Sequence, residues 1–344
     1  MVTRIPGFPA GTFTSSMVTR IPGFSSRDNE TADITLHVKD HKYFLKPGLR
    51  STGERMVVVR IQNFLLMIPI FVTNFGYYFM KLFYRKLGEG PTVIILHGLY
   101  GSSDNWYSIG KELAEDFEVF IPDQRNHGQS PHTDKHTYEL MKLDLLELMD
   151  GEGIDKAILI GHSMGGKTAI SFAAKYPGRV TSLVVIDIAA KSYMKLRDLS
   201  AQTVDHLNIM TAMLNVDFGK VKSREDVDRR LSESIRSPRV RSFLLKNLRR
   251  DPDNSYRWGI NVGTLSRELP AIMDEVGTDQ SGIAGFPVLF IRGEKSSYIL
   301  DEDIPGIKKI FPFADLVTIP DAGHWLHVEK SALLVKTLKY FLLG

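Results

Sequence analysis

Short apolar runs separated by turn residues recur from residue 80 onward. Residues 92–96 read TVIIL between Pro91 and His97-Gly98, which is typical of a strand buried in a parallel sheet. Residues 80–90 alternate apolar and polar side chains and end in a glycine turn, which also predicts a strand. Further buried strands are predicted at residues 118–121, 157–160, 183–186, 288–291 and 316–319.

Helical periodicity fills the stretches between these strands. Apolar residues recur at helical spacing in residues 107–115, 138–149, 167–175 and 331–341. Strands that alternate with helices form a mostly parallel sheet, because each crossover helix packs back onto a face of that sheet. We therefore predict an α/β fold in which helices cover both faces of the sheet.

The alternation stops between about residues 191 and 282. Helical, charge-rich patterns with little strand character occupy residues 199–214, 225–235 and 240–248. An insertion of helices between two core strands indicates a cap over a site. A second independent domain is the alternative, but no linker-like composition separates the stretch on either side. We expect a core made of residues 80–190 and 283–344, with a helical cap at residues 191–282.

The first 79 residues have a different texture. MVTRIPGF occurs at residues 1–8 and again at 17–24, a repeat that stops after two copies and does not describe a repeat fold. Residues 64–71 read FLLMIPIF, but a spanning helix needs about 20 mostly apolar residues and Pro69 interrupts this run. We expect residues 1–79 to be an extension outside the α/β fold. Membrane contact through residues 64–79 is an alternative that we do not favour.

Composition excludes several classes of function. The 43 basic and 40 acidic residues leave a formal net charge of +3, which gives no reason to propose a nucleic-acid partner. The chain has no cysteine, so disulfides, thiolate metal sites and a cysteine nucleophile are excluded. This fits a reducing compartment, and we expect a cytoplasmic protein. The H-E-x-x-H pattern is absent, and we expect neither a metal nor a cofactor. Oligomeric state is not readable from the sequence.

The strongest chemical signal is the segment IGHSMGG at residues 160–166, which follows an apolar strand and opens a helix. This is the G-x-S-x-G nucleophile elbow in the context that it requires. The turn lifts the serine hydroxyl clear of the backbone, and the glycines allow close approach of the neighbouring chain. A chance Gly-Ser-Gly turn is the alternative, but the strand and helix around it argue against chance. We predict that Ser163 is a nucleophile.

A second segment, LHGLYG at residues 96–101, follows another buried strand. Its His-Gly pair lets the backbone turn sharply beside the elbow. We expect the backbone amides of Leu99 and Met164 to form an oxyanion hole. The helix that follows Ser163 should aim its positive N-terminal end at the same point. An ordinary strand-to-helix loop is the alternative, because this motif by itself is only moderately specific.

The expected general base lies between the last predicted strand and the last helix, in the segment DAGHWLHVE. We favour His324, because the glycine before it suits a turn that presents the imidazole at the carboxyl edge of the sheet. His327 is the rival, but we expect it to begin the helix and pack. In the segment DQRNHGQS, Asp123 could serve as an acid. We favour structural roles for Asp123 and His127, because Asp-x-Arg after a strand often braces neighbouring loops.

Four segments together, HGLYGSSDNW, DQRNHGQS, GHSMGG and GHWLHVE, resemble those of α/β-hydrolase-fold esterases. More narrowly, the chain resembles the YbfF-like branch and its mitochondrial abhydrolase-domain relatives. The narrower markers are RNHG at residues 125–128 and IDIA at residues 186–189. The resemblance begins at about Met80 and runs to the C-terminus. It implies the α/β-hydrolase fold.

The acid of the expected triad needs separate consideration. In many α/β-hydrolases it follows the strand after the cap in a G-x-x-D pattern, but here Ser296 occupies that position. A hydroxyl cannot carry the negative charge that stabilises an imidazolium. Asp187 ends the strand before the cap, and the resemblance implies that the acid stands there with Ser296 as a supporting residue. The alternative is that Asp187 braces the cap hinge while Glu294, Asp301 or Asp303 serves as acid.

These expectations combine into one reaction. We predict a serine carboxylesterase that acts through an acyl-enzyme. Its expected substrates are small molecules, namely short- to medium-chain acyl esters or thioesters. The enzymatic alternative is a cofactor-free haloperoxidase or a carbon–carbon bond hydrolase on the same fold. The non-enzymatic alternative is a binding module that kept the fold and lost its catalytic activity. Trp258, Met210 and Met213 could line an acyl pocket, although such residues in helices are more often core.

Overall fold

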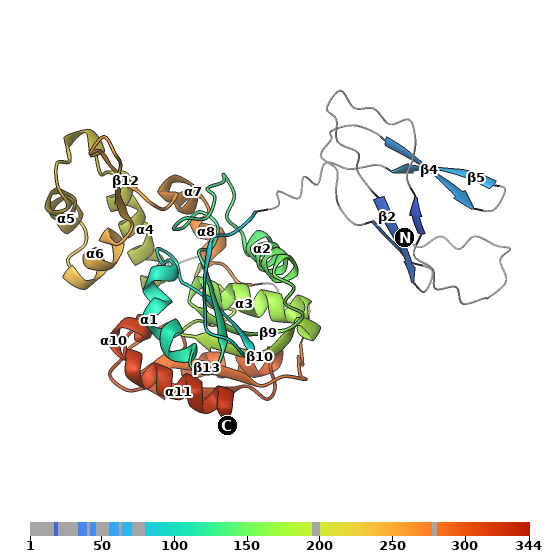
Figure 1. Cartoon of the computed structure of the whole chain (residues 1–344). Helices are drawn as coiled ribbons and strands as arrows, with labels where there is room; N and C mark the ends of the chain where they lie inside the picture. The colour runs from blue at the N-terminus through green and yellow to red at the C-terminus, as the bar shows by residue number, and fades with distance from the viewer. Residues whose placement is uncertain are drawn as a thin grey trace. The chain divides into compact units, whose positions relative to one another are not determined.

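The computed structural model of the chain describes residues 80–194, 200–276 and 281–344, together with the backbone of five strands within the first 70 residues. The chain divides into two compact units, Met1–Tyr78 and Phe79–Gly344, drawn in Figure 1. Each unit is described by itself below.

The described part of the first unit is built from antiparallel strands. β1 (Met17–Thr19), β2 (Ile34–Lys39) and β3 (Lys42–Leu45) form one sheet, and β4 (Arg55–Ile61) pairs with β5 (Phe64–Ile70) in a second. The apolar run at residues 64–70 is thus a strand. Among the described residues, no helix combines the length and the apolar character needed to cross a membrane. Residues 71–79 lie outside the described part.

The second unit is organised around a seven-stranded sheet with the order β14-β13-β10-β9-β7-β8-β6. All neighbouring strands are parallel except β6, which pairs antiparallel with β8 at the edge. The strands are β6 (Tyr84–Leu87), β7 (Thr92–Leu96), β8 (Glu118–Pro122), β9 (Ala157–His162), β10 (Val180–Ile186), β13 (Val288–Gly293) and β14 (Asp315–Ile319).

Helices cover both faces of this sheet because successive strand residues point to opposite sides. Ile94 and Leu96 of β7 belong to a cluster with residues of α2 (Tyr138–Gly151) and α3 (Met164–Lys175). Val93 and Ile95 belong to the opposite cluster, with residues of α1 (Ser103–Leu113) and α11 (Ser331–Leu343). Figure 1 shows the two helix pairs on the two sides of the sheet. Burying each such aliphatic side chain contributes about 1.5–3 kcal/mol.

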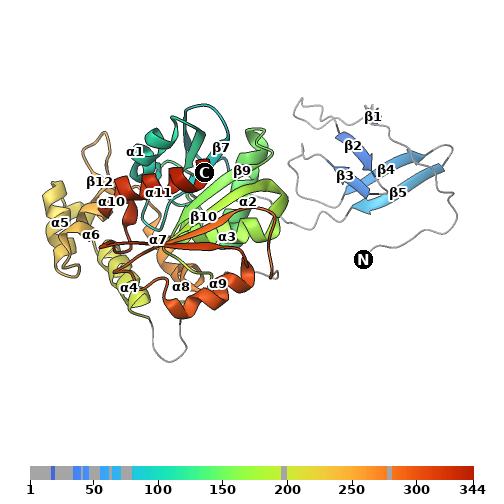
Figure 2. The same ribbon diagram turned by 90° about the horizontal axis from the view of Figure 1, so that it is seen from below.

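The cap lies between β10 and β13 in the chain and is mainly helical. The side chains of Ser200, Ser223 and Ser237 each accept a hydrogen bond from a first-turn amide and so begin its three longest helices. The cap contains α4 (Ala201–Leu214), α5 (Arg224–Ser232), α6 (Pro238–Leu245), α7 (Val262–Arg267) and α8 (Leu269–Met273). Helices α4, α5 and α6 lie together at one side of the unit (Figure 2).

The chain entering the cap and the chain leaving it lie side by side. The amide of Tyr193 donates to the carbonyl of Met273 at 2.8 Å, and the amide of Val276 donates to that of Ala190 at 2.8 Å. The buried ammonium of Lys167, on α3 of the core, donates to the carbonyl of Asp274. We therefore propose residues 191–282 as the cap and residues 80–190 and 283–344 as the core.

The predicted α/β-hydrolase architecture, with its mostly parallel sheet and inserted helical cap, is confirmed. Two predicted helix starts were wrong. Helix α1 begins at Ser103, four residues early, because the Asn105 side chain accepts a bond from the Ser102 amide at 2.8 Å. Helix α3 begins directly after Ser163. The cap also contains a hairpin of β11 (Leu248–Arg250) and β12 (Tyr256–Trp258), whose three-residue strands are too short to show periodicity.

Candidate active site

Ser163 occupies a sharp turn between β9 and α3. Its backbone has φ +52° and ψ −121°, a conformation that non-glycine residues rarely adopt and that marks the strained elbow. The neighbouring glycines are needed for packing. A Cβ on Gly161 would lie 2.4 Å from the carbonyl oxygen of Gly165, and one on Gly165 would lie 2.3 Å from that of Leu96. The sequence pattern around Ser163 therefore follows from the tight contact between the start of α3 and two strands.

His324 approaches Ser163 from the other end of the chain. It lies between β14 and α10 (Leu326–Glu329), and its Nε2 is 3.0 Å from Ser163 Oγ. On its other side, Nδ1 is 2.8 Å from Oδ2 of Asp187. The imidazole therefore bridges the hydroxyl and a carboxylate, with one ring nitrogen facing each.

Asp187 is fully buried and follows directly after β10. Its backbone amide donates to the carbonyl of Ile291 at 2.7 Å, which holds the residue against β13. Its Oδ1 accepts a hydrogen bond from the amide of Gly293 at 3.0 Å, and its Oδ2 accepts one from the hydroxyl of Ser296. A buried carboxylate needs such donors, because an unpaired buried charge is strongly unfavourable.

The other acidic candidates have different partners. Glu294 accepts a hydrogen bond from the amide of Asp321 at 2.9 Å. Asp301 pairs with Arg292 and Asp303 with Lys191, each at 2.7 Å. The structure therefore brings Asp187 to His324 and does not bring these three carboxylates there.

The remaining candidates have structural surroundings. The ring of His327 is stacked on that of Trp106, with centroids 4.8 Å apart and planes 16° apart, and burial lowers the pKa of His327 to about 3. Asp123 accepts hydrogen bonds from the amides of Ser103 at 2.6 Å and Gln129 at 2.8 Å. His127 lies 2.9 Å from the carbonyl of Arg125 through Nδ1. In the part of the chain that the structure describes, none of these side chains forms a hydrogen bond with Ser163.

The two expected oxyanion donors lie beside the elbow. A Cβ on Gly98 would lie 3.2 Å from Ser163 Cβ, so the loop after β7 passes directly against Ser163. Leu99 follows in this loop, and Met164 is the first residue of α3. Within the described residues, neither the Leu99 amide nor the Met164 amide donates a hydrogen bond to another group. Both amides are therefore free to bind a developing negative charge at the positive end of α3.

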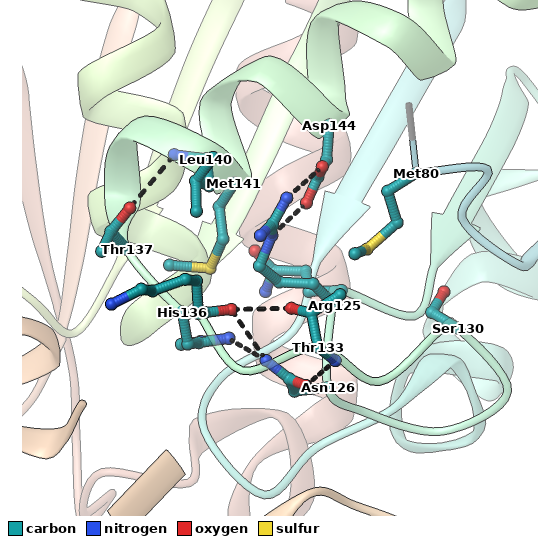
Figure 3. Close-up of polar contacts among 12 residues, drawn as sticks. Met80, Arg125, Asn126, Ser130, Thr133, His136, Thr137, Leu140, Met141 and Asp144 are labelled. Atoms are coloured by element: carbon teal, nitrogen blue, oxygen red, sulfur yellow. Dashed lines mark hydrogen bonds and ion pairs between the residues drawn. The ribbon is translucent and has the colours of Figure 1, made fainter. Parts of the chain in front are cut away.

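A polar network behind the elbow holds the loop after β8. Arg125 forms a buried bidentate pair with Asp144, with both N–O distances at 2.6 Å. Asn126, at φ +64°, accepts a hydrogen bond from the amide of Thr133 at 2.7 Å, and its amide group lies 3.4 Å from Nδ1 of His136. Figure 3 shows these contacts together. Nε2 of His136 then lies 3.2 Å from the sulfur of Met164, so the network reaches the residue next to Ser163.

A cavity of about 500 Å³ opens over Ser163 and is lined by both core and cap. This volume falls in the usual range for small-molecule sites, roughly 300–1,000 Å³. The cap contributes His206, Ile209, Ile235, Arg236, Val240 and Phe243 to its wall. Met210 and Met213 are buried in the core cluster, and neither they nor Trp258 line this cavity. Within residues 80–194, 200–276 and 281–344, no group of three or more His, Asp or Glu could hold a metal ion.

Sequence reasoning missed one aromatic residue at the site. The ring of Tyr298 is stacked on that of His324, with centroids 3.8 Å apart and planes 16° apart. The only signal in the sequence was its place two residues after Ser296, and one tyrosine in a loop is not a specific pattern.

The chain is similar to known proteins over about three quarters of its length. A family profile described as the alpha/beta hydrolase fold matches residues 91–331. The sn-1-specific diacylglycerol lipase ABHD11 of Danio rerio is 38% identical over 263 residues, which cover 74% of this chain and 79% of the relative. Esterase YbfF of Escherichia coli (strain K12) is 32% identical over 250 residues, covering 73% of this chain and 92% of YbfF. The solved structure of a marine microorganism esterase is 45% identical with a TM-score of 0.73, covering 76% of this chain and 99% of that one.

Proposed function

This chain belongs to the α/β-hydrolase family and is a hydrolase of the esterase/lipase type, and from that premise we propose that it cleaves carboxylic esters through an acyl-enzyme on Ser163. The observation that carries the proposal is the continuous line of contacts from Ser163 Oγ through the imidazole of His324 to the Asp187 carboxylate, at 3.0 and 2.8 Å. An esterase needs these three groups within hydrogen-bond distance, because the serine hydroxyl is a weak nucleophile until a base takes its proton.

In the acylation step, Ser163 Oγ attacks the ester carbonyl while Nε2 of His324 takes its proton. The positive charge on the imidazolium is stabilised by the carboxylate of Asp187, which Nδ1–H of the ring faces at 2.8 Å. The amides of Leu99 and Met164 donate hydrogen bonds to the tetrahedral oxyanion. The imidazolium then protonates the leaving alcohol or thiol as the carbon–oxygen or carbon–sulfur bond breaks.

Deacylation repeats the same proton transfers with water. His324 takes a proton from a water molecule, and the resulting hydroxide attacks the acyl carbonyl. Collapse of the second tetrahedral intermediate releases the carboxylic acid, and the imidazolium returns its proton to Ser163. Each proton taken by His324 is given back within the cycle, so the triad ends in its starting state.

The volume and lining of the cavity favour a substrate of moderate size. Its wall combines apolar side chains such as Ile209, Val240 and Phe243 with polar groups from the cap, and this mixture suits short- to medium-chain acyl esters or thioesters. The zebrafish relative is named as an sn-1-specific diacylglycerol lipase, which makes glycerolipid esters the first natural class to test.

The test combines labelling with kinetics. A fluorophosphonate probe should label the wild-type chain and leave Ser163→Ala unlabelled, and a panel of p-nitrophenyl esters, acyl-CoA thioesters and diacylglycerols should identify the substrate class. Ser163→Ala should lower kcat by about 10⁴ to 10⁶, the usual effect of removing a triad nucleophile. Activity of this variant within tenfold of wild type, with an unchanged thermal midpoint, would reject the proposal.

A further inference from the structure

One histidine of the cap contacts two loops of the core at once. His206 lies on α4, and its Nε2 is 3.0 Å from the hydroxyl oxygen of Tyr298. Its Nδ1 is 3.2 Å from the hydroxyl oxygen of Tyr100, and that hydroxyl also donates to the backbone carbonyl of His206 at 3.4 Å. The two tyrosines come from segments almost 200 residues apart in the chain, and both lie beside the nucleophile.

Tyr298 leads from His206 to the general base. Its ring covers the imidazole of His324 at a centroid distance of 3.8 Å. Its amide donates to the hydroxyl of Ser296 at 3.3 Å, and its carbonyl accepts from the hydroxyl of Tyr193 at 2.6 Å. A ring held at both backbone and hydroxyl fixes the plane in which His324 can turn.

Tyr100 leads from His206 to the expected oxyanion hole. It follows Leu99 directly and adopts φ +63°, so its backbone conformation sets the direction of the loop. Its amide donates to Nε2 of His127 at 3.3 Å, and its carbonyl accepts from the side-chain amide of Asn247 in the cap at 2.8 Å. A shift of Tyr100 would therefore move the amide of Leu99.

The imidazole is well suited to bind both hydroxyls. Burial lowers the pKa of His206 to about 3, so the ring is neutral at ordinary pH. A neutral imidazole has one donor nitrogen and one acceptor nitrogen, and a tyrosine hydroxyl can serve either. An asparagine or glutamine side chain at position 206 could place a polar atom where only one of the two ring nitrogens lies, so it could reach only one of the two tyrosine hydroxyls.

We propose that His206 is a positioning residue through which the cap sets both halves of the catalytic geometry, the orientation of His324 through Tyr298 and the place of the Leu99 amide through Tyr100. The inference rests on the proposed esterase function. A misplacement of about 1 Å in a catalytic group can lower the rate about 100-fold, so a residue that fixes two such groups should affect kcat.

The experiment measures kcat and KM for p-nitrophenyl acetate in the full chain, with His206→Ala, Tyr298→Phe, Tyr100→Phe and the double variants. The Phe variants keep each ring and remove only the hydroxyl. Leu207→Ala is the matched control, because this exposed residue neighbours His206 on α4 and does not line the cavity. We expect His206→Ala to lower kcat by about 10- to 100-fold with KM changed less than about threefold. Leu207→Ala should have no such effect.

The double variants carry the decisive result. If His206 acts through the hydroxyls, Tyr298→Phe should cause little further loss once His206 is alanine, so the two losses should be non-additive. Fully additive losses, or a raised KM with unchanged kcat, would overturn the proposal, the second outcome marking His206 as a substrate contact. If His206→Ala does not fold, the two Phe variants carry the test, and normal kcat in both would overturn it. Ester hydrolysis by Ser163→Ala would instead reject the proposed function, whatever the cap variants do.

Discussion

The hydroxyl of Ser296 donates a hydrogen bond to Oδ2 of Asp187, the same oxygen that lies 2.8 Å from Nδ1 of His324. Ser296 stands where many α/β-hydrolases carry the acid, and Asp187 reaches the same point from the neighbouring strand. β10 and β13 are hydrogen-bonded in register up to the pair Ile186–Ile291, so the residues that follow them meet at the carboxyl edge of the sheet. The carboxylate of Asp187 and the hydroxyl of Ser296 thus meet just beyond the ends of adjacent strands.

The first prediction separates these two residues. Asp187→Asn should lower kcat by about 10² to 10⁴, because the amide cannot stabilise the imidazolium and favours the wrong tautomer of His324. Ser296→Ala should lower kcat less than about tenfold, because it removes the hydrogen bonds that the hydroxyl makes to Asp187 and accepts from the Tyr298 amide but removes no charge. Steady-state kinetics on one p-nitrophenyl ester decides, with Glu294→Gln as the control. Near-normal turnover of Asp187→Asn together with inactive Glu294→Gln would place the acid on the later loop.

The second prediction concerns the buried pair of Arg125 and Asp144. Arg125→Met should lower the free energy of unfolding by about 3–5 kcal/mol, because it leaves the Asp144 carboxylate buried without its partner. The double variant Arg125→Met/Asp144→Leu should recover much of that loss, since no uncompensated charge remains. Urea denaturation at pH 7 measures both. A double variant less stable than the single one would show that the pair itself supplies the stability.

The third prediction is a loss of stability in mild acid. Burial lowers the pKa values of His136 and His327 from 6.5 to about 3 in the folded chain. Between pH 6.5 and about 3, the unfolded chain binds protons that the folded chain does not, so stability falls as pH falls. Each residue contributes at most about 1.4 kcal/mol per pH unit. His327→Phe, which can still stack on Trp106, should reduce the difference in unfolding free energy between pH 7 and pH 5. If His327→Phe left this pH-dependent difference in unfolding free energy unchanged, it would contradict a lowered pKa of His327 in the folded chain.

The fourth prediction concerns the first 79 residues. Every residue placed at the candidate site, from Gly98 to His324, belongs to the second unit. In the full chain the Met80 amide donates to Glu147 at 2.9 Å, and in a chain that begins at Met80 the terminal ammonium can donate to the same carboxylate. This shorter chain should hydrolyse esters with kcat/KM within about threefold of the full chain. As a control, a protease site inserted after residue 79 would release the extension only after folding. Inactive or aggregated protein from both routes would show that the extension belongs to the catalytic fold.

Local sequence determined much of the core. The elbow around Ser163 was readable because its glycines are required by contacts with the adjacent turn and strand, and β7 was predicted residue for residue because its neighbours are sharp turn signals. His324 could be singled out as the candidate base because it follows a glycine between the last strand and the last helix. These features depend on residues a few positions apart, whose geometry is set by backbone sterics and the alternation of apolar side chains.

Only the tertiary structure decided which carboxylate faces His324 and which cap residue reaches the site. Asp187 and Gly293 are 106 residues apart, yet strand pairing brings the carboxylate of one to the amide of the other at 3.0 Å. His206 meets Tyr100 and Tyr298 only because the cap folds back over the sheet edge. Such contacts arise from packing between elements that have no pattern in common, and a polar residue on a helix has the same local signal whether it faces water or the cavity over Ser163. The order of strands and the seating of the cap therefore decided this part of the site.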